Sequence, residues 1–307
     1  MNQRSLRLAM LLAAVATLAG PTFGAAANRE PMIVSTSWLA EHLNDPNLVI
    51  IHAGSEPIYR QGHIPGARFL DLASISTPHE EGLMMQLPAA SKLKAVFEKL
   101  GVSDHSRIVA YFGRNNYTAP ARVLLTLEYL SLGDRASFLD GGLTPWQAEG
   151  RPVTTEIPAV HPGSLTVSIR DHIVTDAAWV SAHLRTPGIA ILDARTLEYY
   201  EGREMGAHAG RRGHIPGARN IPFTTLMEEP LGKFKNPSAL QELFRAAGVK
   251  PGDTVVTYCH IGMQASLLYF VARYLGFDAR MYDGSFEEWS NRKDLPVEGP
   301  AEKPAAP

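Results

Sequence analysis

The sequence predicts an α/β protein of two similar domains, each with a mainly parallel β-sheet flanked by helices on both faces. Three observations lead to this fold class. Segments recur in the same order in both halves of the chain, short β-branched runs alternate with amphipathic stretches, and 45% of the 307 residues are hydrophobic. Alternating strands and helices are typical of parallel sheets covered by helices. The length fits two domains of ordinary size.

The clearest repeat is the hexapeptide His-Ile-Pro-Gly-Ala-Arg, which occurs at 63–68 and again at 214–219. An Asp-Gly pair followed by a tryptophan recurs at 140–146 and 283–289. An apolar stretch ahead of each hexapeptide recurs as well. Repeats in the same order indicate a tandem duplication, and their period is far too long for a solenoid. Each copy should therefore be a domain.

The second copy shows the predicted elements most clearly. Strands are expected at 189–193 and 254–258, which are short apolar runs. A helix is expected at 265–275, where apolar residues fall on one face, and Gly276 should end it. The other expected elements are strands at 220–222 and 280–282 and helices at 176–184, 238–247 and 286–290.

The beginning of the chain has the pattern of an export signal. Arg4 and Arg7 precede an uncharged apolar stretch, and small residues follow it. We therefore expect a signal peptide at 1–27 and a location in the bacterial periplasm. The apolar stretch is short for a bilayer span, so we expect no stable membrane association after cleavage. The alternative is an uncleaved anchor.

Composition also indicates the domain boundaries and excludes one class of partner. We expect an N-terminal domain at 32–152, a proline-containing linker at 153–172, a C-terminal domain at 173–298 and a disordered tail at 299–307. The formal net charge of −2 gives no reason to expect nucleic acid binding. The sequence does not indicate an oligomeric state.

The chain contains one cysteine, Cys259, which lies between the predicted strand at 254–258 and the predicted helix at 265–275. A thiol in that position meets the aligned N–H groups and the positive end of the helix dipole. Both stabilise the thiolate, the nucleophilic form. A lone cysteine in an exported chain cannot form an internal disulfide and remains a free thiol. The alternative is a buried structural cysteine that acts as a small hydrophobic residue.

The residues after Cys259 form the predicted substrate-binding loop: His260, Ile261, Gly262, Met263, Gln264 and Ala265. Backbone N–H groups in such a loop can surround an anion, and Gly262 can adopt the positive φ that lets the loop curl. His260 either lowers the thiol pKa as a cation or points to solvent. Gln264 is a candidate hydrogen-bond donor to a substrate oxygen.

These residues resemble the tandem rhodanese-type sulfurtransferases, the family of thiosulfate and 3-mercaptopyruvate sulfurtransferases. The resemblance covers about 34–298 and rests on the His-Ile-Pro-Gly-Ala element, the Asp-Gly-Ser-x-x-x-Trp ending and the Cys loop between strand and helix. In that family only the C-terminal domain carries the reactive cysteine. Aligning the strands that end at Tyr111 and Tyr258 places Phe112 at the position of Cys259. We therefore expect the N-terminal domain to be catalytically silent.

The resemblance implies transfer of sulfane sulfur from thiosulfate to a thiophilic acceptor, cyanide or a thiol, through a persulfide on Cys259. The expected partners are thus a small anionic sulfur donor and that acceptor. The resemblance also implies that Arg195, two residues after Asp193, grips the donor, as a guanidinium does with such anions. The alternative for Arg195 is an ordinary ion pair. A second family arginine aligns with Tyr199, which puts that contact in doubt.

The loop after Cys259 matches neither well-known donor specificity. Thiosulfate enzymes of the family often have Arg and Lys after the cysteine, and mercaptopyruvate enzymes have Gly and Ser, whereas this chain has His260 and Ile261. The Cys-x-x-Gly-x-x-Ala-Ser pattern resembles bacterial members usually called thiosulfate sulfurtransferases. The alternatives are a 3-mercaptopyruvate sulfurtransferase and a non-catalytic persulfide carrier or sulfur-binding protein.

Other chemistry is disfavoured by spacing. We expect no cofactor and no metal, because one cysteine and scattered histidines give no ligand spacing. A cysteine-dependent phosphatase needs Cys-x5-Arg, and Ala265 occupies the corresponding position. His63 and His214 are expected to brace their turns, and the arginine-containing insertion at 204–212 is expected to be a solvated loop.

Overall fold

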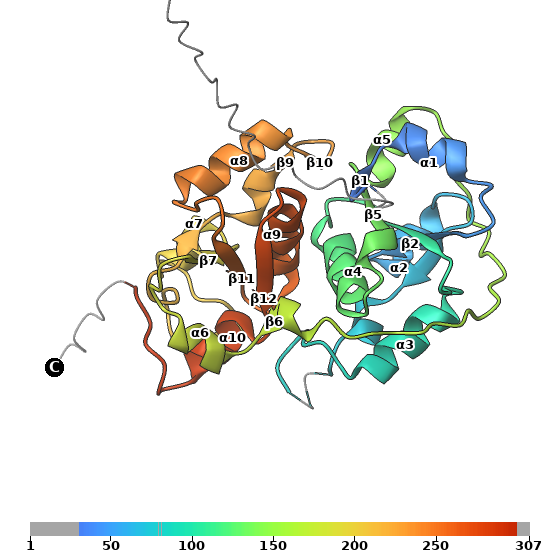
Figure 1. Cartoon of the computed structure of the whole chain (residues 1–307). Helices are drawn as coiled ribbons and strands as arrows, with labels where there is room; N and C mark the ends of the chain where they lie inside the picture. Colours follow the sequence, from blue (N-terminus) through green and yellow to red (C-terminus); the bar gives the residue numbers. More distant parts are fainter. Residues whose placement is uncertain (1–30, 79, 81, 300–307) are drawn as a thin grey trace, which may run out of the picture.

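The computed structural model describes residues 31–78, 80 and 82–299. In it two α/β units lie side by side (Figure 1). The predicted signal peptide and residues 300–307 of the predicted tail lie outside the described residues. Within the described ranges, no helix combines the length and apolarity that a membrane span needs.

The N-terminal unit is a five-stranded parallel sheet with the strand order β1-β5-β4-β2-β3. Its strands are β1 (Ile33–Val34), β2 (Leu48–Ala53), β3 (Arg68–Leu70), β4 (Arg107–Tyr111) and β5 (Ala136–Leu139). Its helices are α1 (Thr36–His42), α2 (Glu56–Gln61), α3 (Ala90–Lys99), α4 (Thr118–Tyr129) and α5 (Leu143–Ala148).

The C-terminal unit repeats this arrangement, with the parallel order β6-β12-β11-β7-β8. Its sheet contains β6 (Val174–Thr175), β7 (Ile189–Asp193), β8 (Arg219–Asn220), β11 (Thr254–Tyr258) and β12 (Asp278–Tyr282), and an antiparallel hairpin is formed by β9 (Met227–Glu228) and β10 (Lys233–Phe234). Its helices are α6 (Ala177–Ala182), α7 (Leu197–Tyr200), α8 (Pro237–Ala246), α9 (Met263–Tyr274) and α10 (Ser285–Asn291). The equal strand orders confirm the predicted fold class and duplication.

The predicted bounds of strands and helices agree best with the structure at the centre of the C-terminal sheet. The strands at 189–193 and 254–258 are confirmed as β7 and β11. Helix α9 begins at Met263 rather than at 265, because Gly262 takes a left-handed conformation (φ 90°) and starts the helix there. Gly276 has φ 88° just after the helix, as expected for its end. Strands β6, β9 and β10 were missed, because segments of two residues carry no periodicity.

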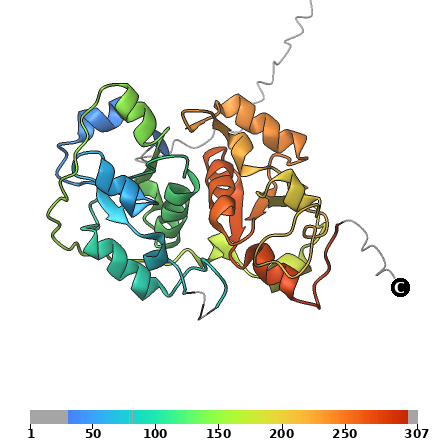
Figure 2. The same ribbon diagram turned by 180° about the vertical axis from the view of Figure 1, so that it is seen from behind.

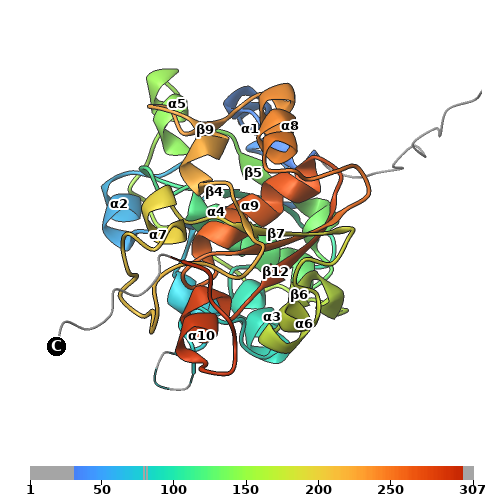
Figure 3. The same ribbon diagram turned by 90° about the vertical axis from the view of Figure 1, so that its left-hand side faces the viewer.

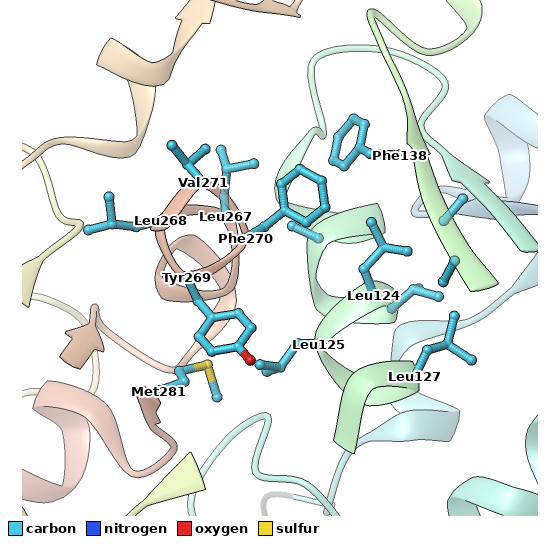
Figure 4. Packing of buried hydrophobic residues seen from close by; sticks show 14 of the residues in the cluster. Leu124, Leu125, Leu127, Phe138, Leu267, Leu268, Tyr269, Phe270, Val271 and Met281 are labelled. Carbon is cyan, nitrogen blue, oxygen red and sulfur yellow. The ribbon is translucent and has the colours of Figure 1, made fainter. Parts of the chain in front are cut away.

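Helices α4 and α9 pack against each other and join the two units, as the views from behind and from the side also show (Figures 2 and 3). Ten of the twelve residues of α4 and eight of the twelve residues of α9 are buried. Figure 4 shows Tyr269 and Phe270 of α9 facing Leu124 and Leu125 of α4. Helices that are apolar on almost every side belong in a core, so the two units share one hydrophobic cluster.

Each unit also sends an arm across to the other. In the N-terminal unit, the backbone N–H of Leu87 donates to Asp283 Oδ2 at 2.8 Å. In the C-terminal unit, the N–H of Phe234 in the β9–β10 hairpin donates to Asp140 Oδ1, also at 2.8 Å. Asp140 and Asp283 are the aspartates of the repeated Asp-Gly pair. The two arms are therefore equivalent parts of the duplication, and each holds the other unit's Asp-Gly turn.

The segment predicted to be a linker is tied to the N-terminal unit. Gly163 donates its N–H to the carbonyl of Glu98 at 2.7 Å, and Leu165 donates to Glu98 Oε1 at 2.8 Å. Leu165 itself is buried. The connection between the units is thus held by specific hydrogen bonds along the surface of the first unit.

Candidate active site

Cys259 lies directly after β11 and before α9, as predicted. Its side chain is 1% exposed, and Sγ accepts a hydrogen bond from the N–H of Gly262 at 3.2 Å. The left-handed conformation of Gly262 turns this N–H back towards the sulfur. A side chain at Gly262 would be strained by that conformation, so glycine is the residue that suits the turn.

The opposite side of the Cys loop is held by the repeated Asp-Gly turn. Ser285 Oγ accepts from the N–H of Cys259 at 3.3 Å. The carbonyl of Cys259 accepts from Phe286 at 2.9 Å, and the carbonyl of His260 accepts from Glu287 at 3.0 Å. These bonds satisfy the backbone of the loop that carries the thiol. The position of Cys259 is thereby fixed from both sides.

The protonation of Cys259 reflects two opposing effects. Burial raises the pKa of the thiol above its ordinary value, and this is the larger effect. Hydrogen bonds from the backbone of Ala265, Ile261, Gly262 and Gln264 favour the thiolate and oppose the increase in pKa. The expected donors are therefore present, but they do not give the resting thiol a depressed pKa.

His260 is part of the site but is not a cation in it. Burial, together with the nearby positive charge of Arg195, lowers the pKa of this imidazole to about 4. Its ring contacts Tyr199 edge-on, with the ring centroids 4.6 Å apart. The imidazole is neutral at pH 7, so any thiolate must be stabilised by the loop N–H groups and not by His260.

Arg195 forms a buried ion pair with Asp193. Nε is 3.0 Å from Asp193 Oδ1 and Nη2 is 2.5 Å from Oδ2. Nη2 also donates to the carbonyl of Gly213, and the guanidinium carbon lies 4.0 Å from the centroid of the Phe286 ring. Nη1 makes no hydrogen bond within the described residues. The charge is close enough to Cys259 for the two groups to interact.

A cavity of about 330 Å³ lies beside the Cys loop. Its walls are formed by Tyr199, Gly206, Ala207, His208, Ala209, His260, Ile261, Gln264, Phe286 and Glu287. Three of the predicted loop residues therefore line it directly. Gly262 and Ala265 are buried, and Met263 and Ala265 belong to the first turn of α9. Residues 206–209 of the insertion at 204–212 form one wall, and most of the insertion is exposed, as expected for a solvated loop.

Sequence reasoning missed Arg122, which approaches the site from the N-terminal unit. This side chain of α4 is completely buried, and Nη1 lies 3.3 Å from Asp283 Oδ1. Nη2 donates to the carbonyl of Met85. Nη1 also lies behind Gly262, 3.3 Å from where a Cβ would be. The available signal was a single arginine within the apolar stretch that forms α4.

The repeated histidines do brace their turns. His63 Nδ1 is hydrogen-bonded to the carbonyl of Tyr59, and His214 Nδ1 to that of Tyr200, both at 2.8 Å. Each imidazole also stacks on the same tyrosine, with centroids 3.9 Å apart. Neither histidine lines the cavity beside the Cys loop.

Phe112 occupies the position of Cys259 in the other unit. Its carbonyl accepts the N–H of Leu143 at 3.0 Å, the counterpart of the Phe286 bond to Cys259. Phe112 is buried, and a Cβ added to Gly232 in the β9–β10 hairpin would lie 3.1 Å from its ring. The second unit's hairpin thus closes the site that corresponds to the active one.

Groups of three or more His, Cys, Asp or Glu placed to hold a metal ion do not occur in the described part of the chain.

Comparison with known proteins gives a consistent picture. The model of the rhodanese-like domain matches 35–149 and 176–292. The thiosulfate sulfurtransferase of Azotobacter vinelandii is 32% identical over 271 residues, which cover 87% of this chain and 97% of that protein. The 3-mercaptopyruvate sulfurtransferase of Escherichia coli K12 is 31% identical over 277 residues, covering 86% and 97%.

A solved structure agrees with these relatives. The crystal structure of SseA, a 3-mercaptopyruvate sulfotransferase from Escherichia coli, superposes with a TM-score of 0.74 at 27% identity, covering 83% of this chain and 99% of that one. Both domain matches and both relatives extend over most of the chain. The chain therefore belongs to the tandem-domain rhodanese-type sulfurtransferases.

Proposed function

We propose that the protein transfers sulfane sulfur from thiosulfate to a thiophilic acceptor through a persulfide on Cys259. The observation that carries this proposal is the Gly262 N–H donated to Sγ at 3.2 Å, in a loop whose other N–H groups converge on the same sulfur. Such a ring of donors stabilises a sulfur anion in the thiolate and in the persulfide. The thiosulfate sulfurtransferase relative supports this donor.

The reaction proceeds in two displacements. The Cys259 thiolate attacks the outer sulfur of thiosulfate, the S–S bond of thiosulfate breaks, and sulfite leaves with the bonding electron pair. A nucleophile such as cyanide then attacks the outer persulfide sulfur and releases the Cys259 thiolate. Since the pKa of the thiol is raised, the rate of the first step should keep rising with pH beyond the range where an ordinary thiol has ionised.

Arg195 is the candidate for the donor's negative charge. Its Nε and Nη2 are bound to Asp193 and Gly213, and Nη1 has no partner in the described part of the chain. We propose that Nη1 and the positive charge of Arg195 act on the donor at Cys259. His260 and Ile261 would then contact the donor without charge, because the imidazole is neutral at pH 7.

The identity of the sulfur donor is tested by assaying thiosulfate and 3-mercaptopyruvate in parallel. The mass of the intact protein is measured by mass spectrometry after each reaction. We expect thiosulfate to add the mass of one sulfur atom to the wild type. A mass increase with 3-mercaptopyruvate only would replace thiosulfate with that donor, as the second relative makes possible.

Cys259→Ser should abolish sulfur transfer, lowering kcat by roughly 10³-fold or more, because a hydroxyl cannot hold a sulfane sulfur. Circular dichroism should show that the fold survives, since serine has nearly the same size. Retained thiocyanate formation in this variant would overturn the proposed mechanism.

We also propose export to the periplasm, on the basis of the charged and apolar pattern at 1–27. Cell fractionation of the full chain in a Gram-negative bacterium tests this. We expect a shortened protein in the periplasmic fraction, and a full-length protein confined to the cytoplasm would contradict it.

A further inference from the structure

Ser285 has a backbone conformation that residues with a side chain rarely adopt. Its φ is 49°, in the left-handed region that favours glycine. The other described non-glycine residues with a positive φ are all at least partly exposed, whereas Ser285 is completely buried. The surrounding structure must therefore hold Ser285 in this conformation, and strained residues of this kind cluster at active sites.

The N-terminal unit has a glycine at the same position. The turn Asp140-Gly141-Gly142 corresponds to Asp283-Gly284-Ser285, and Gly142 has a positive φ as well, 61°. A Cβ added to Gly142 would lie 2.5 Å from the carbonyl oxygen of Phe112, so that turn has no room for a side chain. The fold of the turn can therefore be made with glycine, and the serine belongs to the unit that carries the thiol.

The hydroxyl of Ser285 connects this turn to the backbone of Cys259. Oγ donates to the carbonyl of Tyr282 at 3.1 Å. A hydroxyl has one proton and two lone pairs, so the bond to Tyr282 leaves Oγ as an acceptor, and it accepts the N–H of Cys259 at 3.3 Å. Both residues are buried, and a buried N–H that loses its acceptor is destabilising. The bond therefore fixes where the backbone of Cys259 lies.

The position of this backbone determines whether the sulfur meets the N–H groups of its loop. Those groups belong to the residues after Cys259, and the N–H of Gly262 is bonded to Sγ at 3.2 Å. The N–H of Cys259 itself is bonded to Ser285. Ser285 thus holds the first residue of the loop, while the helix start at Gly262 holds its far end.

We propose that Ser285 is a positioning residue for the nucleophile: its hydroxyl holds Cys259 so that the sulfur stays within reach of the loop N–H groups. The left-handed backbone is the strain that this contact requires. Ser285 does not line the cavity beside the Cys loop, so it acts through Cys259 and not on the substrate. This inference rests on the proposed function, because it explains how the same thiol is held for sulfur transfer.

Two variants separate the hydroxyl from the backbone conformation. Ser285→Ala removes the hydroxyl and keeps a side chain at the strained position, whereas Ser285→Gly removes the hydroxyl and the strain together. We expect both to form the persulfide about tenfold more slowly than wild type at saturating thiosulfate, because the thiol is less well placed. The thiosulfate concentration that gives half the maximal rate should stay within about twofold. Rapid quenching followed by intact-mass detection measures both values.

Stability should distinguish the two variants from each other. Ser285→Gly should melt about 3 °C above Ser285→Ala, because glycine adopts this φ without strain. The matched control is Ser137→Ala, which removes another completely buried hydroxyl, one that donates to the carbonyl of Pro31 in the N-terminal unit. This control should lower the melting temperature and leave persulfide formation unchanged. A loss of stability alone would then not explain the slower reaction.

A measurement without any sulfur donor tests the hydrogen bond itself. Cys259 is the only cysteine of the chain, so labelling cysteine with ¹⁵N gives a single amide signal in an NMR spectrum. The amide proton should move to lower chemical shift in both Ser285 variants, because it loses its acceptor. It should stay in place in Ser137→Ala.

An unchanged rate of persulfide formation in Ser285→Gly, or an equal slowing in Ser137→Ala, would overturn this inference alone. An amide signal that stays in place in the Ser285 variants would do the same. A wild-type protein that gains no sulfur atom on Cys259, by intact mass, would overturn the proposed function, while the amide signal would still report whether Ser285 holds Cys259. The two failures are therefore distinguished.

Discussion

The two domains share one scaffold, and only one of them holds a usable thiol. The strand orders are equal, and Phe112 and Cys259 accept equivalent backbone hydrogen bonds from Leu143 and Phe286. The loops that follow differ: one runs from 113 to 117 and the other from 260 to 262 before the helix begins. The scaffold thus fixes where a nucleophile would stand, and a few loop residues decide whether chemistry occurs there.

The same comparison extends to the strand next to the loop. Asp193 of β7 pairs with Tyr258, and His52 of β2 pairs with Tyr111 in the same register. Where the C-terminal domain has the Asp193–Arg195 ion pair, the N-terminal domain therefore has His52 and Gly54. The N-terminal domain thus lacks both this ion pair and a thiol at the equivalent positions. Charge in this position belongs to the site and is not required by the fold.

The contrast between the two domains would not hold if a thiol at residue 112 were enough for sulfur transfer in the N-terminal domain. In a Cys259→Ser chain, Phe112→Cys should leave sulfur transfer roughly 10³-fold or more below wild type. The reason is that the longer loop lacks the Gly262 turn and the hairpin at Gly232 lies against residue 112. Thiocyanate formation is the measurement, with Cys259→Ser as the control. A sulfur adduct on the new cysteine would show that the β9–β10 hairpin does not close the site around residue 112.

Arg195→Met should lower the free energy of unfolding by about 3–5 kcal/mol, because it leaves the Asp193 carboxylate buried without its partner. The double variant Asp193→Asn/Arg195→Met should recover most of that loss, towards the uncharged state of the N-terminal domain. Urea unfolding of both variants checks this.

The same double variant tests the role of Arg195 in binding. It should fold and still show a raised KM for thiosulfate, because the positive charge is absent. A wild-type KM in the folded double variant would remove Arg195 from donor binding and leave it as a structural ion pair.

The sequence predicted the features that repeat or alternate. The duplication, the central strands β7 and β11, and the places of Cys259 and Phe112 could all be predicted, because buried strands and repeated motifs leave local patterns. The ion pair of Arg195 was foreseen only as an alternative, because a partner two residues away does not reveal how deeply both are buried.

Contacts between the domains could not be predicted from one sequence. Arg122 meets Asp283 over a separation of 161 residues, and no local period encodes such a pair. The pKa of the Cys259 thiol could not be predicted from one sequence either. The helix N-terminus suggested a lowered pKa. The burial of Cys259 depends on tertiary packing, and this burial raises the pKa.

The two domains also differ at Arg122 of α4, because the equivalent residue of α9 is the apolar Leu267. Arg122→Met should cost about 3 kcal/mol, because it removes the buried partner of Asp283. It should also slow persulfide formation about tenfold in stopped-flow assays, since Asp283 anchors the turn that holds the Cys loop.

Arg273→Met is the matched control for this position. Arg273 also joins the two helices, 3.0 Å from Glu128, but it is partly exposed and lies at the end of α9 away from the loop. It should cost about 1 kcal/mol and leave persulfide formation unchanged. Equal slowing in both variants would show that Arg122 acts only through general stability.

His52 of the N-terminal domain allows a prediction about stability alone, without an effect on sulfur transfer. Both ring nitrogens are buried and have no hydrogen-bond partner among the residues that the structure describes, and burial lowers the pKa of the imidazole to about 4. The folded pKa lies below the unfolded value of about 6.5, so the unfolded chain binds the proton more tightly. The stability contribution is therefore complete above pH 6.5 and is lost as the pH falls towards 4.

At pH 5 this loss should amount to about 2 kcal/mol, and His52→Leu should remove it. Urea unfolding of wild type and variant at pH 7.5 and pH 5 measures the difference, with sulfur transfer at pH 7.5 expected to be unchanged. His260, whose pKa is also about 4, should leave a similar acid dependence in the His52→Leu protein. An unchanged acid dependence in the variant would mean that His260, and not His52, governs acid stability.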